Sequence, residues 1–409
     1  MQHQVWQIAS GAEGRDYSWL FLKHDLMFLG PGRYGPYETE HYWRVVERGE
    51  FTRQKIGTVR NLSERVRPGD IVLLRKVHQV VAIGVVVEDE DGSNGYRHDG
   101  NFGDVYGWDL EHTRRVIWQE QLARELKRIQ TDSELFASYK QQPTFTRVRD
   151  QETLDRISPL ISKCVQRPLK PRPDRLPPVL SPAELGQKLF SKGMPNNAVD
   201  NVLGAIERQQ RLLKWYYAQG EESSRPDEHE VVAHMILPLL LAMGWSEQLL
   251  AVEWHKVDLA AFRGTPTTAE RCVLLCEAKR MRHGLQNVRD QALDYVKKLK
   301  LSGCRKILLT QGSRFYLYDR GDGTWPAHAE PTGYINLERI RENHIAPANT
   351  NAVETLMALT PAGVQRTVGE VPGKHEILPR LYNSLAGSSS CGSGATSAGP
   401  GRRGGQAKG

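Results

Sequence analysis

A proline-rich segment near the middle of the chain is the feature that most restricts its possible folds. Residues 167–178 read Arg-Pro-Leu-Lys-Pro-Arg-Pro-Asp-Arg-Leu-Pro-Pro, with five prolines in twelve positions. Proline lacks a backbone N–H and fixes φ, so such a run forms neither a helix nor a central strand. We therefore expect an extended linker that separates folded parts of this 409-residue chain.

The first part, residues 1–118, is expected to be a β domain. It contains β-branched runs at Asp70–Arg75 and Val80–Val87, separated by turn signals, and we expect a final strand over Tyr106–Trp118. Many short strands without intervening helices favour a small β-barrel.

Residues 119–222 are expected to be a helical connector that includes the linker. Leu, Arg, Glu, Lys and Gln recur with helical periodicity over 119–142. Ser181-Pro-Ala-Glu184 has the N-cap, the first-turn proline and the third-position glutamate of a helix start. A further helix is expected over 198–219.

Residues 223–337 predict a mixed α/β domain with a central sheet. The expected order is helix 228–243, strand 250–262, strand 271–280, helix 285–300, strand 306–310 and strand 315–319. Residues 338–383 follow as a C-terminal extension. The Gly/Ser-rich residues 384–409 have no periodicity and predict a disordered tail.

The strongest chemical signal is Asp258, followed nineteen residues later by Glu277-Ala-Lys279. In a strand, Glu277 and Lys279 project to the same face. Charges at the end of an apolar strand are costly unless they are paired. A Mg²⁺ ion held by Asp258 and Glu277, with Lys279 beside it, would account for them and would suit phosphodiester hydrolysis. An isolated Glu-x-Lys on a solvated face, by contrast, needs no function.

Other polar residues are spaced to border the same site. Glu228 and Glu230 open the helix that leads into Pro238-Leu-Leu-Leu-Ala-Met-Gly-Trp, and either one is a candidate helix carboxylate. Gln291 and Tyr295 lie four residues apart, which places them on one helical face.

These residues resemble the PD-(D/E)xK nuclease superfamily, and in particular the N-terminal nuclease domain of type I restriction enzyme motor subunits. The resemblance covers about residues 223–337. It implies that Asp258, Glu277 and Glu228 bind metal, that Lys279 is catalytic, and that Gln291 is an accessory residue of the site. The spacing to Pro238 favours Glu228 over Glu230. The proline of the family name is absent, because Val257 precedes Asp258.

The segments Ile56–Asn61 and Val66–Val72 resemble EVE domains of the PUA-like superfamily, a likeness that extends over about residues 6–118. It implies a pocket for a flipped or unpaired base in DNA or RNA. For any one aromatic residue here, packing in the core is the alternative role. The candidate base-binding residues are Trp19, Trp43, Trp108, Arg60 and Asn61.

Composition excludes several classes of protein. No apolar stretch approaches the roughly 20 residues that span a bilayer, and no signal-peptide pattern or Walker A loop is present, so we expect a cytoplasmic protein that binds no membrane and no NTP. The five cysteines have neither disulfide-framework nor zinc spacing. The net charge of +7 includes three charges from the tail, which leaves +4 for the rest and permits a nucleic-acid partner.

Together these features predict a Mg²⁺-dependent (or Mn²⁺-dependent) DNA endonuclease of restriction or defence type, directed to modified DNA by its N-terminal domain. One such centre cuts one strand, so a homodimer is expected for double-strand cleavage. Two alternatives stay open: a nucleic-acid-binding protein with an inactive nuclease-like domain, and an RNA-directed nuclease.

Overall fold

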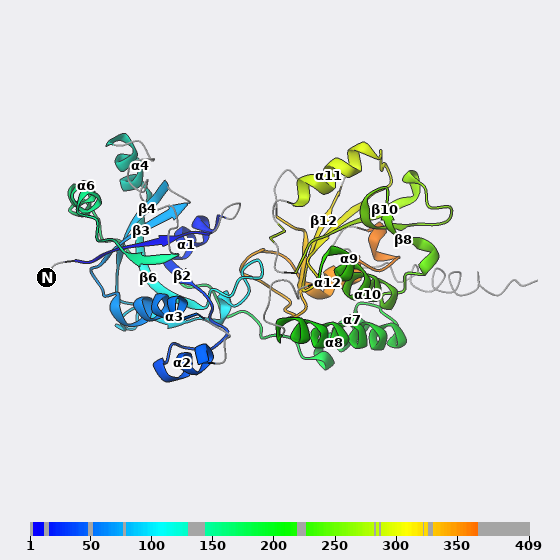
Figure 1. The fold of residues 1–409 in the computed structure, drawn as a ribbon, viewed down its shortest axis with the longest axis horizontal. Coiled ribbons are helices and arrows are strands. Elements are labelled where there is room, and N and C mark those ends of the chain that lie inside the picture. Colours follow the sequence, from blue (N-terminus) through cyan, green and yellow to red (C-terminus); the bar gives the residue numbers. More distant parts are fainter. Residues whose placement is uncertain are drawn as a thin grey trace, which may run out of the picture.

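The computed structural model of the protein contains two mixed α+β units joined by an extended segment (Figure 1). The residues that it describes are 3–11, 16–47, 52–76, 79–129, 144–218, 226–281, 284–285, 288–321, 323–325 and 330–366.

The N-terminal unit is built on a curled sheet of seven strands in the order β2-β6-β4-β3-β1-β7, with β5 paired to β6. Only β1 and β3 are parallel. Helices α1 to α3 pack on one face of the sheet, and α4 and α6 cover the other face. The elements are β1 (Val5–Ala9), α1 (Ser18–His24), β2 (Leu26–Leu29), α2 (Thr39–Glu47), α3 (Arg53–Arg60), β3 (Ile71–Lys76), β4 (Gln79–Val86), β5 (Tyr96–His98), β6 (His112–Gln119), α4 (Glu120–Ile129), β7 (Phe145–Arg147) and α6 (Gln151–Ile161).

The runs expected at Asp70–Arg75 and Val80–Val87 are confirmed as the hairpin β3–β4. The expected small β-barrel is confirmed only in part. The sheet is a curled half-barrel that ends at β2 and β7, and helices α1 to α3 lie between its strands along the sequence. The last strand begins at His112 rather than at Tyr106. A turn with positive φ at Tyr106 and Gly107 precedes it, and the Asp104 carboxylate accepts a hydrogen bond from Gly107 N.

The boundary expected at residue 118 does not divide the structure. Strand β7 pairs with β1, and Phe145 stacks on Trp6 with ring centroids 5.2 Å apart. Leu122, Ile157 and Leu160 lie in the same core cluster as β3 and β4. The first half of the expected connector is therefore part of the N-terminal unit. The expected helix over 119–142 is described only as α4, and residues 130–143 lie outside the described residues.

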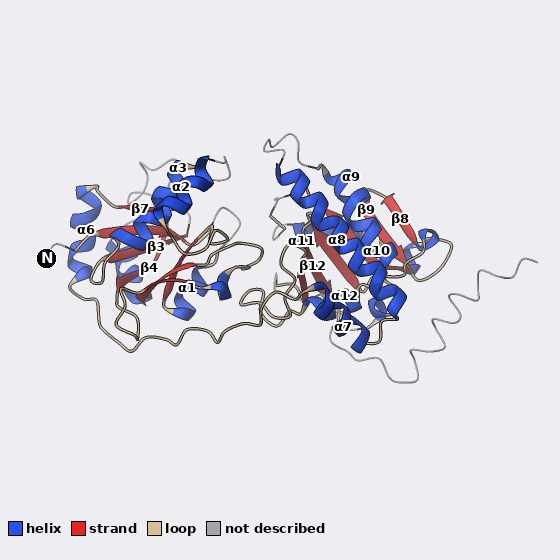
Figure 2. Cartoon of the chain, turned by 90° about the horizontal axis from the view of Figure 1, so that it is seen from below, coloured by secondary structure: helices blue, strands red, loops and turns tan. Residues whose placement is uncertain are grey.

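The segment 167–178 contains neither helix nor strand, as expected, and runs along the N-terminal unit (Figure 2). Arg167 makes a two-pronged ion pair with the buried Asp25, at 2.6 and 2.7 Å. Arg172 binds the buried Asp89 at 2.8 Å. The linker is thus attached by charged hydrogen bonds rather than only by its two ends.

The C-terminal unit is a six-stranded sheet in the order β13-β12-β11-β10-β9-β8, in which β10 and β11 are parallel and the other neighbours antiparallel. Helix α11 covers one face, and α7, α8, α10 and α12 cover the other. The elements are α7 (Pro182–Ser191), α8 (Asn196–Ala218), α9 (Glu228–Val231), α10 (Leu237–Ala242), β8 (Leu250–Trp254), β9 (Val257–Phe262), β10 (Cys272–Ala278), α11 (Val288–Lys298), β11 (Lys306–Thr310), β12 (Arg314–Asp319), β13 (Gly333–Asn336) and α12 (Ala352–Ala358).

Most of the elements expected in this unit are confirmed. Ser181 caps α7 in a capping box with Glu184, and a π turn over 232–236 joins α9 to α10 in one helical segment. The expected single strand over 250–262 is wrong, because His255 and Lys256 both have positive φ and form a tight turn between β8 and β9.

The parts assigned to the ends of this unit differ from the expectation. Helices α7 and α8, expected in the connector, belong to its core, as does α12 from the expected C-terminal extension. The expected tail over 384–409 lies outside the described residues, as does the rest of the extension from 367. In the part of the chain that the structure describes, no helix is long and apolar enough to cross a membrane, and the four cysteines there are free.

Candidate active site

The carboxyl end of β10 carries the charged residues of the candidate site. All seven residues of β10 are buried, and Glu277 is 2% exposed. Cys276 and Ala278 pack with the helices on one face of the sheet, so strand alternation turns Glu277 toward the opposite face, where α11 lies. Lys279 follows directly, and its backbone N–H donates to the carbonyl oxygen of Thr310 at the end of β11 (2.8 Å).

Strand β9 brings Asp258 to the same end of the sheet. The antiparallel pairing of Leu259 with Cys276 places Asp258 level with Glu277. Asp258 Oδ2 accepts a hydrogen bond from Ala278 N at 2.6 Å. This bond fixes the Asp258 carboxylate at Ala278, the residue between Glu277 and Lys279.

Two side chains hydrogen-bond to the same oxygen of Glu277. Gln291, on α11, donates from Nε2 to Glu277 Oε1 at 2.6 Å, and Lys279 Nζ donates to this oxygen at 3.0 Å. The second oxygen, Oε2, is buried and has no hydrogen-bond partner among the described residues. A buried carboxylate oxygen without a donor is costly, which marks the position as one that a ligand can satisfy.

The structure distinguishes Glu228 from Glu230. Glu228 Oε1 lies 3.5 Å from Lys279 Nζ. Glu230 instead forms a capping box with Asp227, accepting from Asp227 N at 3.1 Å and donating its own N–H to Asp227 Oδ1 at 2.9 Å. Glu228 is therefore the helix carboxylate of the site, and Glu230 stabilises the helix start.

Burial dominates the electrostatics of the site. It raises the pKa of Glu277 to about 7, assisted by the charge of Asp258. Burial likewise raises the pKa of Asp258 above its usual value, against the hydrogen bond from Ala278. For Lys279, burial would lower the pKa, but the hydrogen bond and charge of Glu277 outweigh it and the pKa is raised. Lys279 therefore stays a cation, while the two carboxyls are not readily ionised together without a further cation.

The arrangement fits a hard divalent cation at Asp258 and Glu277. Mg²⁺ is commonly held by one or two carboxylates, with water and phosphate oxygens completing its shell. The unpartnered Glu277 Oε2 is available for such an ion. Within the described ranges, no group of three or more His, Cys, Asp or Glu side chains converges as a metal site. A cation here would be held by the Asp258 and Glu277 carboxylates, with further oxygens completing its shell.

Tyr295 and Thr310 differ in how they relate to the candidate site. Tyr295 is half-buried and packs against the core cluster beneath α11, and no hydrogen bond between described residues links it to the carboxylates of the site. The Thr310 carbonyl, which holds the backbone of Lys279, was not expected from the sequence. A backbone contact between distant strands leaves no residue-type signal.

The three candidate base-binding tryptophans of the N-terminal unit are exposed. Trp19, Trp43 and Trp108 are 37%, 40% and 43% exposed. Trp19 and Trp43 lie on α1 and α2, which are apart in both views (Figures 1 and 2). Arg60 is paired with Glu64 at 2.8 Å, and the backbone carbonyl of Asn61 accepts from Val66 N.

A polar aromatic cluster in this unit was missed from the sequence. The hydroxyls of Tyr42 and Tyr96 contact the two ring nitrogens of the buried His112 at 2.7 and 2.9 Å. His98 lies against it, with ring centroids 5.5 Å apart, and 3.6 Å from the Glu111 carboxylate. Because its members come from α2, β5 and β6, no short motif contains them.

Comparisons with family models, with curated proteins and with solved structures each find no match to this chain. The geometry alone therefore defines the site: an α/β unit in which Asp258 and Glu277 lie on adjacent strands, Lys279 follows the second strand, and Gln291 reaches Glu277 from α11.

Proposed function

We propose that the protein is a Mg²⁺-dependent DNA endonuclease of restriction or defence type. The observation that carries the proposal is the environment of the Glu277 carboxylate, which lies level with Asp258. Its Oε1 accepts from both Lys279 and Gln291, and its buried Oε2 has no hydrogen-bond partner among the described residues. This environment supports the assignment of the C-terminal unit to the PD-(D/E)xK nuclease fold that its sequence resembles.

Each residue then has a distinct task. Asp258 and Glu277 would hold the cation, and Glu228 would border the site from α9. When bound, Mg²⁺ supplies a more acidic water and polarises the attacked phosphate. Lys279 holds a protonated ammonium beside the negative charge that develops on the phosphate. Gln291 orients the Glu277 carboxylate through its 2.6 Å bond, which leaves Oε2 directed away from the donors.

The N-terminal unit is proposed as a reader of modified bases, related to EVE and PUA-like domains. The support is its exposed tryptophans. Lys23 Nζ lies over the Trp19 ring, 6.0 Å from its centroid, and the Arg53 guanidinium carbon lies over the Trp43 ring, 5.9 Å from its centroid. Aromatic faces and nearby cations are suited to stacking on bases and to attracting phosphates. We further propose that the protein acts in the cytoplasm and that two copies meet to cut both strands.

One side-by-side digestion tests these assignments. Purified full-length protein is incubated with modified duplex DNA, the same duplex unmodified, and RNA, with Mg²⁺ and with EDTA. We expect Mg²⁺-dependent cutting of modified duplex, and no cutting by Asp258→Ala, which should remain folded. Preferred cutting of RNA would favour the RNA-directed alternative. Nucleic-acid binding without cutting in any arm would favour the inactive, binding-only alternative.

A further inference from the structure

The two units are joined by a buried contact that does not involve the linker. A loop of the N-terminal unit, residues 102–108 (here called the docking loop), packs against β12, β13 and the segment near residue 346. Its central residue, Asp104, is 3% exposed. The Asp104 carboxylate accepts hydrogen bonds from Tyr334 Oη at 2.8 Å and from Asn336 Nδ2 at 3.1 Å, both across the contact. His344 Nε2 lies 3.5 Å away.

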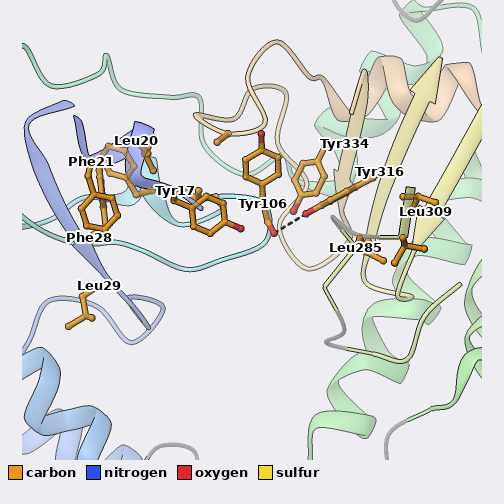
Figure 3. Close-up of a cluster of buried hydrophobic side chains, with 14 of the residues drawn as sticks. Tyr17, Leu20, Phe21, Phe28, Leu29, Tyr106, Leu285, Leu309, Tyr316 and Tyr334 are labelled. Atoms are coloured by element: carbon orange, nitrogen blue, oxygen red, sulfur yellow. Dashed lines mark hydrogen bonds between the residues drawn. The ribbon is translucent and has the colours of Figure 1, made fainter. Parts of the chain in front are cut away.

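An aromatic chain runs through the same contact. Figure 3 shows Tyr106 of the docking loop between Tyr17 of the N-terminal unit and Tyr316 and Tyr334 of the C-terminal unit. The Tyr17 and Tyr106 rings stack at 5.8 Å, and the Tyr316 ring meets Tyr106 edge-on at 6.3 Å. Tyr316 Oη donates to the backbone carbonyl of Tyr106 at 3.1 Å, and Tyr106 N donates to Ala346 O at 2.8 Å.

Gly107, the second of the two glycines in the docking loop, lies against the C-terminal unit. Gly107 has φ +82, and a Cβ at this position would lie 2.0 Å from the Arg314 side chain of β12. The loop backbone is therefore pressed against the C-terminal unit, where only glycine fits.

The linker gives a second, independent attachment. Arg167 and Arg172 bind it to the N-terminal unit, and Leu180 N donates to Ile340 O of the C-terminal unit at 2.8 Å. Two units that share only a small, hydrated contact move freely relative to each other. A contact made of buried hydrogen bonds and packed rings, by contrast, favours one relative orientation of the two units.

We propose that Asp104 fixes the N-terminal unit relative to the candidate active site, so that cleavage falls at one narrow distance from the base that the N-terminal unit binds. This rests on the proposed function. Asp104 acts as a positioning residue, because its carboxylate bonds to Gly107 of its own loop and to Tyr334 and Asn336 across the contact. A mobile connection would instead let the active site reach many phosphates, and the cuts would scatter.

The test maps cut positions on duplexes that carry a single modified base. We compare full-length wild type with Asp104→Ala and with Tyr334→Phe, which removes one bond to Asp104 but keeps the ring. Tyr217→Phe is the matched control, since it removes a 2.7 Å bond to Glu338 within the C-terminal unit. We expect a narrow window of cuts for wild type and the control, and a severalfold wider window for the two interface variants.

A second readout does not depend on cleavage. Spin labels at the exposed positions Glu40 on α2 and Arg211 on α8, introduced as Glu40→Cys and Arg211→Cys, report the distance between the units. We expect one narrow distance distribution, broadened by Tyr334→Phe and more so by Asp104→Ala. A wild type that cuts at scattered positions, or an Asp104→Ala variant that keeps both the window and the distance narrow, overturns the inference. A wild type that cuts no modified DNA overturns the proposed function instead, while the distance measurement still decides whether Asp104 holds the units together.

Discussion

Replacing Glu277 with glutamine is expected to stabilise the metal-free protein while it abolishes cleavage. Burial and the charge of Asp258 raise the Glu277 pKa from 4.5 to about 7, which disfavours the ionised side chain by about 3 kcal/mol at pH 8. Because the folded-state pKa is raised, this cost is small at pH 5, grows as the pH rises from about 4.5 to 7, and is complete above that.

The amide of Glu277→Gln carries no charge but keeps an oxygen that can accept from Gln291 and Lys279. The pKa of about 7 already includes the attraction of Lys279. The amide N–H₂ group must be desolvated in place of the second oxygen, which offsets part of the gain. We therefore expect a net stabilisation of about 1–2 kcal/mol at pH 8. For a unit of this size, each kcal/mol raises Tm by about 2–4 °C. At pH 5 the two proteins should differ much less.

Thermal unfolding in EDTA at pH 5 and pH 8 measures this difference, and the same scans with Mg²⁺ supply the control. Mg²⁺ at about a hundred times its Kd should stabilise wild type by about 2.7 kcal/mol and the variant by far less. Two results would refute the assignment of Glu277 as a buried carboxylate that is costly to ionise and that binds Mg²⁺. One is a variant less stable than wild type at pH 8, and the other is a variant that Mg²⁺ stabilises as much as wild type.

Two further predictions concern Lys279 and the linker. Lys279→Ala should lower the rate of single-turnover cleavage at saturating Mg²⁺ by orders of magnitude. Lys279→Arg should restore little of that rate, because a planar guanidinium does not replace a compact ammonium. Rates within a few-fold of wild type in both variants would show that Lys279 is a surface residue without a catalytic role. Arg172→Ala should raise the pH of acid unfolding of the N-terminal unit, followed by circular dichroism. Arg115 and Arg172 hold the pKa of Asp89 at about 2, although burial alone would raise it. The ionised Asp89 therefore contributes stability above pH 3.8, and this stability is lost as the pH falls toward 2. An unchanged acid transition would contradict this.

The elements with strong periodicity were predictable, and so was the order of residues in the candidate site. Strand alternation placed Glu277 and Lys279 together, and helical spacing placed Gln291 on α11. The turn at His255 and Lys256 was not predictable, because it adopts positive φ without the Gly or Asn that signals such a turn. One strand was therefore expected where two exist.

Contacts between segments that are distant in the sequence could not be predicted either. Strand β7 is three residues long and is a strand only because β1 lies beside it. Asp104 carries no motif, and its role depends on Tyr334 and Asn336 more than two hundred residues later. Such contacts are properties of the folded chain, and local patterns do not contain them.

The pairing of β7 with β1 has a practical consequence for any shortened form of the protein. A fragment that stops at residue 118 would remove the partners of Val5 O and Ala9 N, which bond to Val148 N and Thr144 O, and would leave β1 as an open sheet edge. It would also uncover Trp6, which Phe145 shields. Exposed apolar edges recruit strands from other molecules, so such a fragment should self-associate and precipitate. A fragment that ends after α6 keeps the edge covered, and it is the shorter form that should remain monodisperse.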